Sequence, residues 1–295
     1  MKHLFACLLL ACSTSLFAAP LKVVASFSIL ADISERVGGE RIAVRALVGP
    51  DGDAHAWQSR PSDARLVMDA DVVIANGLGF DTWLERLAAS AGSRSVILAA
   101  EGVKPLDQHD DHDHHGDDHG PLDPHAWQNV ANVRIYARNI ATALIAADAA
   151  GESYYRERLA AYDAELAALD ADIRQRFTAL PEDARKVVTS HDAFAYFGAA
   201  YGVRFLSAAG VGNRSEVSAA AMARLIRQLR KEKVPVVFIE NVNDPRLIER
   251  IGAEGGARVG GTLYSDALSG PDGPAASYVA MMRHNADTIL AGIRP

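Results

Sequence analysis

A six-residue pattern occurs twice in this sequence, seventy positions apart, and each copy carries one histidine. Residues 53–58 read Asp-Ala-His-Ala-Trp-Gln and residues 123–128 read Asp-Pro-His-Ala-Trp-Gln, so five of the six positions match. Imidazole nitrogen is a common ligand of divalent transition metals. His55 and His125 are therefore candidate metal ligands. The alternative is that each tryptophan anchors its loop and the histidine is incidental.

Later strand-like runs supply the other candidate ligands. His191 follows the apolar run 186–189, and capping of the next helix explains its neighbours but not its imidazole. A zinc site without cysteine takes about four nitrogen or oxygen ligands, and carboxylates serve as well as imidazole. Asp266 is the preferred fourth ligand, although it could be a simple turn residue. Glu240, at the end of the run 236–239, is the rival carboxylate.

A third group of candidates lies in the run 107–120, which is rich in Asp, His and Gly and has almost no apolar residue. Such a composition cannot form a packed core, and we expect a mobile loop. Its histidines are His109, His112, His114, His115 and His119. A flexible loop loses conformational entropy when it closes on an ion, so these residues predict a secondary, weaker metal site. The alternative is a solvated spacer.

The start of the chain indicates export. Residues 1–19 combine a basic start, a short apolar run and small residues, which is typical of a secretory signal peptide cleaved after Ala18 or Ala19. A lipoprotein with Cys12 as its modified N-terminus is the less favoured alternative. Both cysteines, Cys7 and Cys12, lie in this segment, so the mature protein has no thiolate for a metal and no disulfide. We expect it in the periplasm.

Composition narrows the class of protein further. The net charge of −7 argues against nucleic-acid binding, and a hydrophobic fraction of 49% is ordinary for a globular protein. After the signal segment no apolar stretch reaches 18 residues, so no further membrane span is expected. The sequence also lacks the His-Glu-x-x-His motif and the serine nucleophile elbow of hydrolases. We therefore expect a binding protein and not an enzyme; an exported zinc hydrolase is the distant alternative.

Apolar runs and helix-like segments alternate through most of the chain, which predicts an α/β fold. The expected strands are 21–26, 42–48, 71–75, 95–98, 186–189, 203–207, 236–239 and 257–260. The pattern predicts two α/β lobes, at 20–150 and 181–295, each a mainly parallel sheet with flanking helices. Between them, residues 151–180 predict a rigid linking helix of about 25 residues, roughly 37 Å long at 1.5 Å per residue.

Over the whole mature chain, these motifs resemble the zinc- and manganese-specific solute-binding proteins of bacterial ABC importers, the cluster A-I family. Within that family the chain looks most like the AztC-type zinc binders. The matching parts are the exported start, the His-rich run, and the motifs at 53–55, 123–125, 189–194 and 264–266. Ala54 and Ala56 flank His55 where the family often has proline and an acidic residue, and this departure favours Asp266 as the fourth ligand.

The resemblance implies a metal held between the lobes by His55, His125, His191 and Asp266. It also implies a monomer that delivers Zn²⁺ to an ABC permease and its ATPase, with a periplasmic zinc metallochaperone as a candidate donor. Three imidazoles favour zinc, whereas manganese or iron is the alternative cargo within the same family. A metal-storing or adhesive surface protein is a further alternative. Neutral imidazoles are required, so we expect binding to weaken as the pH falls through roughly 6 to 7.

Overall fold

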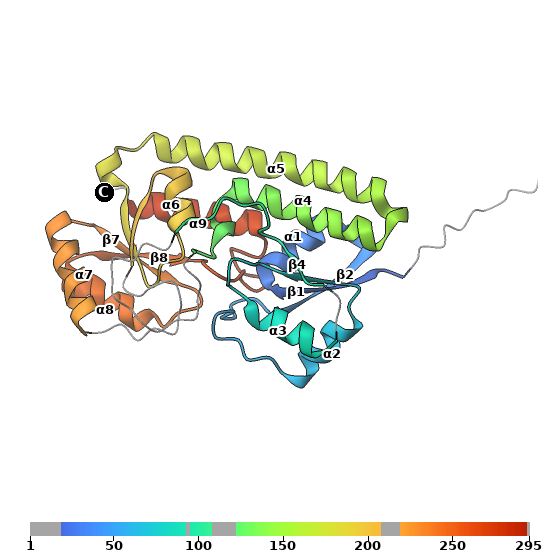
Figure 1. The fold of residues 1–295 in the computed structure, drawn as a ribbon. Helices are drawn as coiled ribbons and strands as arrows, with labels where there is room; N and C mark the ends of the chain where they lie inside the picture. Colours follow the sequence, from blue (N-terminus) through green and yellow to red (C-terminus); the bar gives the residue numbers. More distant parts are fainter. Residues whose placement is uncertain (1–18, 93–94, 108–121, 208–218, 294–295) are drawn as a thin grey trace, which may run out of the picture.

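The computed structural model describes residues 19–92, 95–107, 122–207 and 219–293. It contains two four-stranded parallel sheets, with strand orders β2-β1-β3-β4 and β6-β5-β7-β8 (Figure 1). The first sheet consists of β1 (Leu21–Phe27), β2 (Ile42–Val48), β3 (Val72–Ala75) and β4 (Ile97–Leu98). The second consists of β5 (Lys186–Thr189), β6 (Arg204–Ser207), β7 (Val236–Glu240) and β8 (Arg258–Leu263). The predicted fold class, two α/β lobes with parallel sheets, is confirmed.

Helices flank both sheets. Those that surround the first sheet are α1 (Ser28–Gly38), α2 (Pro61–Asp69), α3 (Thr82–Ser90) and α4 (Val130–Ala147). Those of the second half are α6 (Ala195–Tyr201), α7 (Ala219–Glu232), α8 (Pro245–Gly255) and α9 (Tyr278–Ile293). Short 3-10 helices are η1 (Gly39–Arg41), η2 (Ala126–Gln128), η3 (Ala149–Gly151) and η4 (Glu182–Ala184). We call the first sheet with α1–α4 and η2 the N-terminal lobe, and the second sheet with α6–α8 the C-terminal lobe.

Helix α5 (Glu152–Thr178) lies along the side of the molecule and contacts helices associated with both sheets (Figure 1). One face of α5 is buried, and this face carries Tyr155, Tyr162, Leu166, Leu169, Ile173 and Phe177. Arg134 on α4 makes two hydrogen bonds of 2.7 Å to the Asp163 carboxylate on α5. With 27 residues, α5 extends for roughly 40 Å at 1.5 Å per residue. It packs against α1 and α4 and also against α6 and α9, so it joins helices of both halves.

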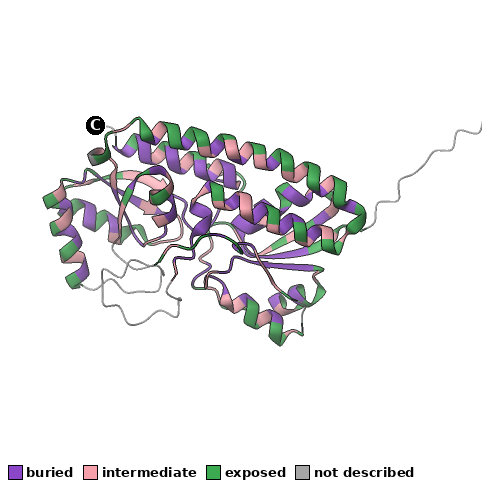
Figure 2. Ribbon diagram, turned by 45° about the horizontal axis from the view of Figure 1, so that its top comes forward, coloured by how far each residue is buried: buried purple, intermediate pink, exposed green. Residues whose placement is uncertain are grey.

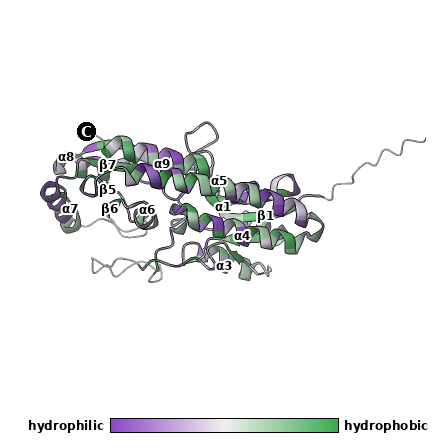
Figure 3. Ribbon diagram, turned by 90° about the horizontal axis from the view of Figure 1, so that it is seen from above, coloured by the Kyte–Doolittle hydropathy of each residue, from purple (hydrophilic) through white to green (hydrophobic). Residues whose placement is uncertain are grey.

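Apolar side chains of both halves form one large core. The buried set extends from Val23 on β1 through Ile173 on α5 to Ile293 at the end of α9. In Figure 2 the buried residues face inward from the helices toward the sheets, and Figure 3 shows α7 largely in the hydrophilic colour. Helix α9 belongs by sequence to the second half, but it contacts α1 and α5 as well as β8. No helix of the described residues is long and apolar enough to cross a membrane.

Two strands differ most in length from the expected ranges: β4 is Ile97–Leu98, shorter than the expected 95–98, and β8 is longer than expected. Strand β8 extends to Leu263, whereas the apolar pattern suggested an end near residue 260, because the residues after Gly260 still pair with β7 through an irregular register. Helix α6 begins at Ala195, because residues 190–194 form the turn that carries His191. The longer β8 brings Asp266 closer to the end of its strand, whereas β5 ends at Thr189 as expected.

Candidate metal centre

The four side chains predicted to hold a metal lie together, each close to the end of a regular element. His191 comes two residues after β5 and Asp266 three residues after β8. His55 lies in the loop that follows β2, and His125 immediately precedes η2. Loops at the carboxyl ends of parallel strands are where open α/β sheets bind ligands. All four residues are buried, with at most 7% of the surface of any one exposed.

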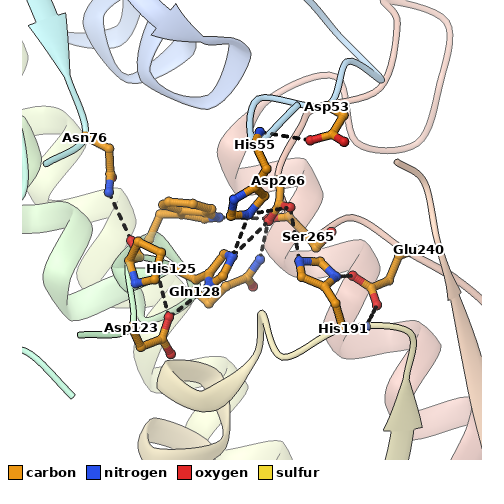
Figure 4. A network of polar contacts seen from close by, with 12 residues as sticks. Asp53, His55, Asn76, Asp123, His125, Gln128, His191, Glu240, Ser265 and Asp266 are labelled. Atoms are coloured by element: carbon orange, nitrogen blue, oxygen red, sulfur yellow. Dashed lines mark hydrogen bonds and ion pairs between the residues drawn. The ribbon is translucent and has the colours of Figure 1, made fainter. Parts of the chain in front are cut away.

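The distances between the candidate donor atoms suit a small cation. His55 Nε2 lies 3.2 Å from His125 Nε2 and 3.4 Å from an Asp266 oxygen, and His191 Nε2 lies 3.2 Å from that oxygen. His125 Nε2 is 3.6 Å from the other oxygen of Asp266. Taking one donor atom from each of the four residues, all four atoms lie within 4.8 Å of one another. Ligands at about 2.0–2.1 Å from a tetrahedral zinc ion would be roughly 3.4 Å apart. The cluster thus approaches the size of a tetrahedral coordination shell (Figure 4).

Several of these atoms lack a hydrogen bond. Three buried atoms make no hydrogen bond: the two carboxylate oxygens of Asp266 and Nε2 of His191. The carboxylate and the ring are nevertheless close enough to form an ion pair. A buried polar atom that is left unsatisfied costs free energy, and such atoms are rare in folded proteins. The His191–Asp266 ion pair compensates only part of this cost, and a bound cation would satisfy the converging lone pairs.

Two further carboxylates lie behind the imidazoles and contact their other ring nitrogens. Asp123 Oδ1 is 2.8 Å from His125 Nδ1, and Glu240 Oε2 is 2.6 Å from His191 Nδ1. A carboxylate beside Nδ1 favours a proton on that nitrogen, which leaves the lone pair of Nε2 for the centre of the cluster. For His125 the contact is a hydrogen bond, whereas His191 Nδ1 also lies 3.2 Å from Asn243 Nδ2. The structure thus places Glu240 behind His191 and not among the converging donors (Figure 4). Glu240, the rival fourth ligand in the sequence analysis, is better described as a partner of His191.

The two copies of the repeated motif form the same turn. Asp53 Oδ1 accepts a hydrogen bond of 2.9 Å from the His55 N–H, and Asp123 Oδ1 accepts one of 2.9 Å from the His125 N–H. An aspartate that accepts a hydrogen bond from the backbone two residues later closes an Asx turn. This explains why aspartate precedes histidine by two positions in both copies. Sequence reasoning noted the match but assigned the aspartates no role.

An aromatic wall covers one side of the cluster. The Phe80 ring lies 4.7 Å from the His55 ring and 4.8 Å from the Trp127 ring, measured between centroids. Trp127 is fully buried and lies 5.2 Å from the His125 ring. These rings limit access of water and lower the local dielectric, which strengthens the interactions of any charge inside. Phe80 carries no sequence signal of its own, because it follows β3 in a loop without any repeated motif.

Burial and neighbouring charges change the proton affinities of the cluster. Burial lowers the pKa of His55 despite the opposing effect of Asp266, so its imidazole is held neutral. Burial would also lower the pKa of His191, but the Glu240 and Asp266 carboxylates outweigh it and raise that pKa well above its usual value. The same ion pair with His191 overcomes burial and holds the pKa of Asp266 well below its usual value. Without metal, the site is therefore centred on a His191–Asp266 ion pair.

The five histidines of the run 107–120 lie outside the described residues, and the secondary site remains a prediction. The residues that flank this run are described: Asp107 pairs with Leu122 in an isolated antiparallel bridge. The segment that follows leads directly into Asp123 and His125. The run therefore joins the chain next to one of the candidate ligands. The predicted signal segment likewise lies outside the described residues, apart from Ala19.

Comparisons with known proteins identify the class. Residues 23–292 match the family model described as zinc-uptake complex component A, periplasmic (ZnuA). The chain is 32% identical to the manganese-binding lipoprotein MntA of Halalkalibacterium halodurans over 275 residues, which is 92% of this chain and 88% of the relative. It is 31% identical to the iron-binding protein YfeA of Yersinia pestis over 271 residues, 92% and 86% of the two chains.

Solved structures agree with this classification. The periplasmic zinc binding protein TroA of Treponema pallidum superposes with a TM-score of 0.85 at 28% identity, covering 94% of this chain and all of that one. The Mn-bound periplasmic metal binding protein of Candidatus Liberibacter asiaticus gives a TM-score of 0.81 at 26% identity, covering 93% of this chain and all of that one.

The protein belongs to the ZnuA family of metal-binding solute-binding proteins of ABC importers. It is thus a binding protein that acts outside the cytoplasm and not an enzyme, and members of this family deliver metal to a permease and its ATPase. The relatives are named for manganese, iron and zinc, so membership in the family does not select the metal. The AztC-type assignment within the family stays a prediction.

Proposed function

We propose that the protein binds one zinc ion in the periplasm through His55, His125, His191 and Asp266 and delivers it to an ABC importer. The observation that carries the proposal is the buried convergence of three imidazole nitrogens and one unsatisfied carboxylate within 4.8 Å. Among the described residues, no cysteine or additional carboxylate belongs to that group. Four ligands complete a zinc shell and leave no open position of the kind that catalytic zinc sites keep for water.

The choice of zinc rests on the donor set. Imidazole suits zinc, while manganese prefers a shell with more oxygen ligands and a higher coordination number. Here nitrogen outnumbers oxygen among the converging residues, and the two additional carboxylates face the outer ring nitrogens instead of the centre. Manganese or iron remains the competing cargo, because relatives at 31–32% identity are named for those metals.

Metal-stripped mature protein, titrated with zinc against a competing chelator, tests the binding part of this proposal. We expect one tight zinc ion per chain plus weaker binding that disappears when residues 108–119 are deleted. Nitrogen-rich sites bind zinc more tightly than manganese whatever their role, so affinity alone does not establish the cargo. A titration with no tight site would refute the assignment.

Growth of the source bacterium supplies the test of cargo. Without the gene, we expect poor growth in medium depleted of zinc by a chelator, and recovery when zinc is added or when the intact gene is restored. A gene copy with His191→Ala should not restore growth, whereas one with His284→Ala should, because His284 lies outside the cluster and contacts the Thr262 carbonyl on β8. Recovery with manganese instead of zinc would overturn the choice of metal.

A further inference from the structure

The segment that carries Asp266 follows β8 in the sequence, but its hydrogen bonds attach it mainly to the N-terminal lobe. We call residues 264–277, between β8 and α9, the Asp266 segment. Its Leu268 N–H donates to Ser28 Oγ at 3.0 Å, and its Leu268 carbonyl accepts from the Asp51 N–H at 2.8 Å. Ser28 begins α1 and Asp51 follows β2, so both partners belong to the N-terminal lobe. Beyond the segment, the Tyr278 N–H donates to Asp32 on α1 at 2.9 Å.

The strongest attachment lies one residue before Asp266. The Ser265 carbonyl accepts a hydrogen bond of 2.8 Å from Trp127 Nε1 and one of 2.7 Å from Gln128 Nε2. These two donors occupy both lone pairs of the carbonyl oxygen. Trp127, Gln128, Ser265 and Asp266 are each 0% exposed, so the bonds form away from water, where they are stronger.

The second copy of the repeated motif therefore has a role that the first copy lacks. Gln58, which corresponds to Gln128, is exposed. Trp57, which corresponds to Trp127, packs against Trp83 and lies under the Arg60 guanidinium at 5.1 Å. The matching histidines both reach the metal cluster, but only the second Trp-Gln pair holds the backbone of another candidate ligand.

His191 is attached differently. Glu240 Oε1 accepts hydrogen bonds from the backbone N–H groups of Ser190 at 2.7 Å and His191 at 3.0 Å. Its other oxygen contacts the His191 ring. Glu240 is the last residue of β7, which pairs with β5, so His191 is fixed to the second sheet. The Asp266 segment has fewer contacts of this kind, chiefly Asn241 Nδ2 to the Ala267 carbonyl at 3.3 Å and the Tyr264–Asn285 bonds.

We propose that Gln128 and Trp127 are positioning residues that fix Asp266 to the N-terminal lobe, so that Asp266 moves together with His55 and His125. The inference rests on the proposed metal site. Asp266 lies within the C-terminal range 181–295 by sequence, but this inference places three ligands on one body and one, His191, on the other. Opening of the lobes would then withdraw His191 from a shell whose other three members stay in place.

A double-mutant cycle on zinc affinity tests this inference. Gln128→Met removes the N–H donor at similar volume and should weaken zinc binding by about tenfold, as is typical when an outer partner of a metal site is lost. In an Asp266→Ala background the same change should have little effect, because the residue acts through Asp266. Ser28→Ala, a smaller change at the other anchor of the segment, should show the same dependence on Asp266 with a smaller effect.

Matched controls separate positioning from general damage. Gln58→Met alters the corresponding residue of the first motif, and Asn139→Ala removes another amide that donates to two backbone carbonyls, those of Ala99 and Glu101. Both controls should leave zinc affinity within about twofold of wild type, which is the scale of a surface change. If Gln128→Met lowered zinc affinity by the same factor in the wild-type protein and in the Asp266→Ala variant, the inference would be overturned. If Asp266→Ala alone left zinc affinity unchanged, the proposed metal site itself would be refuted.

Discussion

Replacing His191 with alanine should lower zinc affinity between about 100-fold and several thousand-fold, because removing one member of a buried charged set costs roughly 3–5 kcal/mol. The substitution takes away one of the three converging imidazoles and leaves Glu240 buried without its ring partner. Chelator competition on the mature protein measures the change. His284→Ala is the matched control, since that ring contacts the Thr262 carbonyl and does not belong to the cluster.

The pH dependence of zinc binding should also identify His191 as a ligand. The raised pKa of His191 means that its ring is protonated in the metal-free protein, and Nε2 must lose that proton before it can bind zinc. At low pH His191 keeps this proton, so zinc affinity should fall by about tenfold for each unit of pH below the pKa of His191. The weakening should begin above the interval of roughly 6 to 7 expected for an ordinary histidine. His191→Ala should flatten the dependence; an equally steep one in this variant would contradict the assignment.

Replacing Asp266 with alanine should cause a loss of similar size. Asp266 is the one carboxylate of the cluster, both of its oxygens are buried without a hydrogen bond, and its lowered pKa keeps it charged. Its removal leaves the ion without its one directly converging carboxylate, since Asp123 and Glu240 contact only the outer ring nitrogens, and this again costs about 3–5 kcal/mol. The same chelator competition measures the effect.

A neighbouring carboxylate provides the control for this variant. Asp272 lies on the same segment but is exposed, so Asp272→Ala should leave zinc affinity unchanged within about twofold. Asp123→Asn should have an intermediate effect of about 10- to 100-fold, because Asp123 orients the His125 ring without joining the cluster. If Asp266→Ala bound zinc as tightly as Asp272→Ala does, Asp266 would not be a ligand.

Local patterns were sufficient to predict most of the architecture. Apolar runs of four to seven residues between helix-like segments located the strands of both sheets, because buried parallel strands are nearly continuous in hydrophobic residues. In the predicted linking helix, Tyr155, Tyr162 and Ile173 recur at helical spacing, and all three lie on the buried face of α5. The candidate ligands were also visible locally, since each follows a strand or lies within a repeated motif, and the structure brings all four together.

The partners of these residues could not be predicted in the same way. Glu240 meets His191 only because β5 and β7 are adjacent in the sheet, although α6, β6 and α7 separate them in the sequence. Gln128 reaches the Ser265 carbonyl across 137 positions, whereas its counterpart Gln58 is exposed, so even the repeated motif could not indicate this contact. Such contacts depend on the packing of distant segments, and no periodicity or spacing encodes them.

The most direct test of the metal site is diffraction from crystals of the zinc-loaded mature protein, with data collected on both sides of the zinc absorption edge. We expect one strong anomalous peak among the four residues, about 2.0–2.1 Å from Nε2 of His55, His125 and His191 and a similar distance from one Asp266 oxygen. Glu240 and Asp123 should remain on the outer ring nitrogens. A peak elsewhere, or a zinc ion bound by fewer than four of these side chains with water completing its shell, would contradict the account.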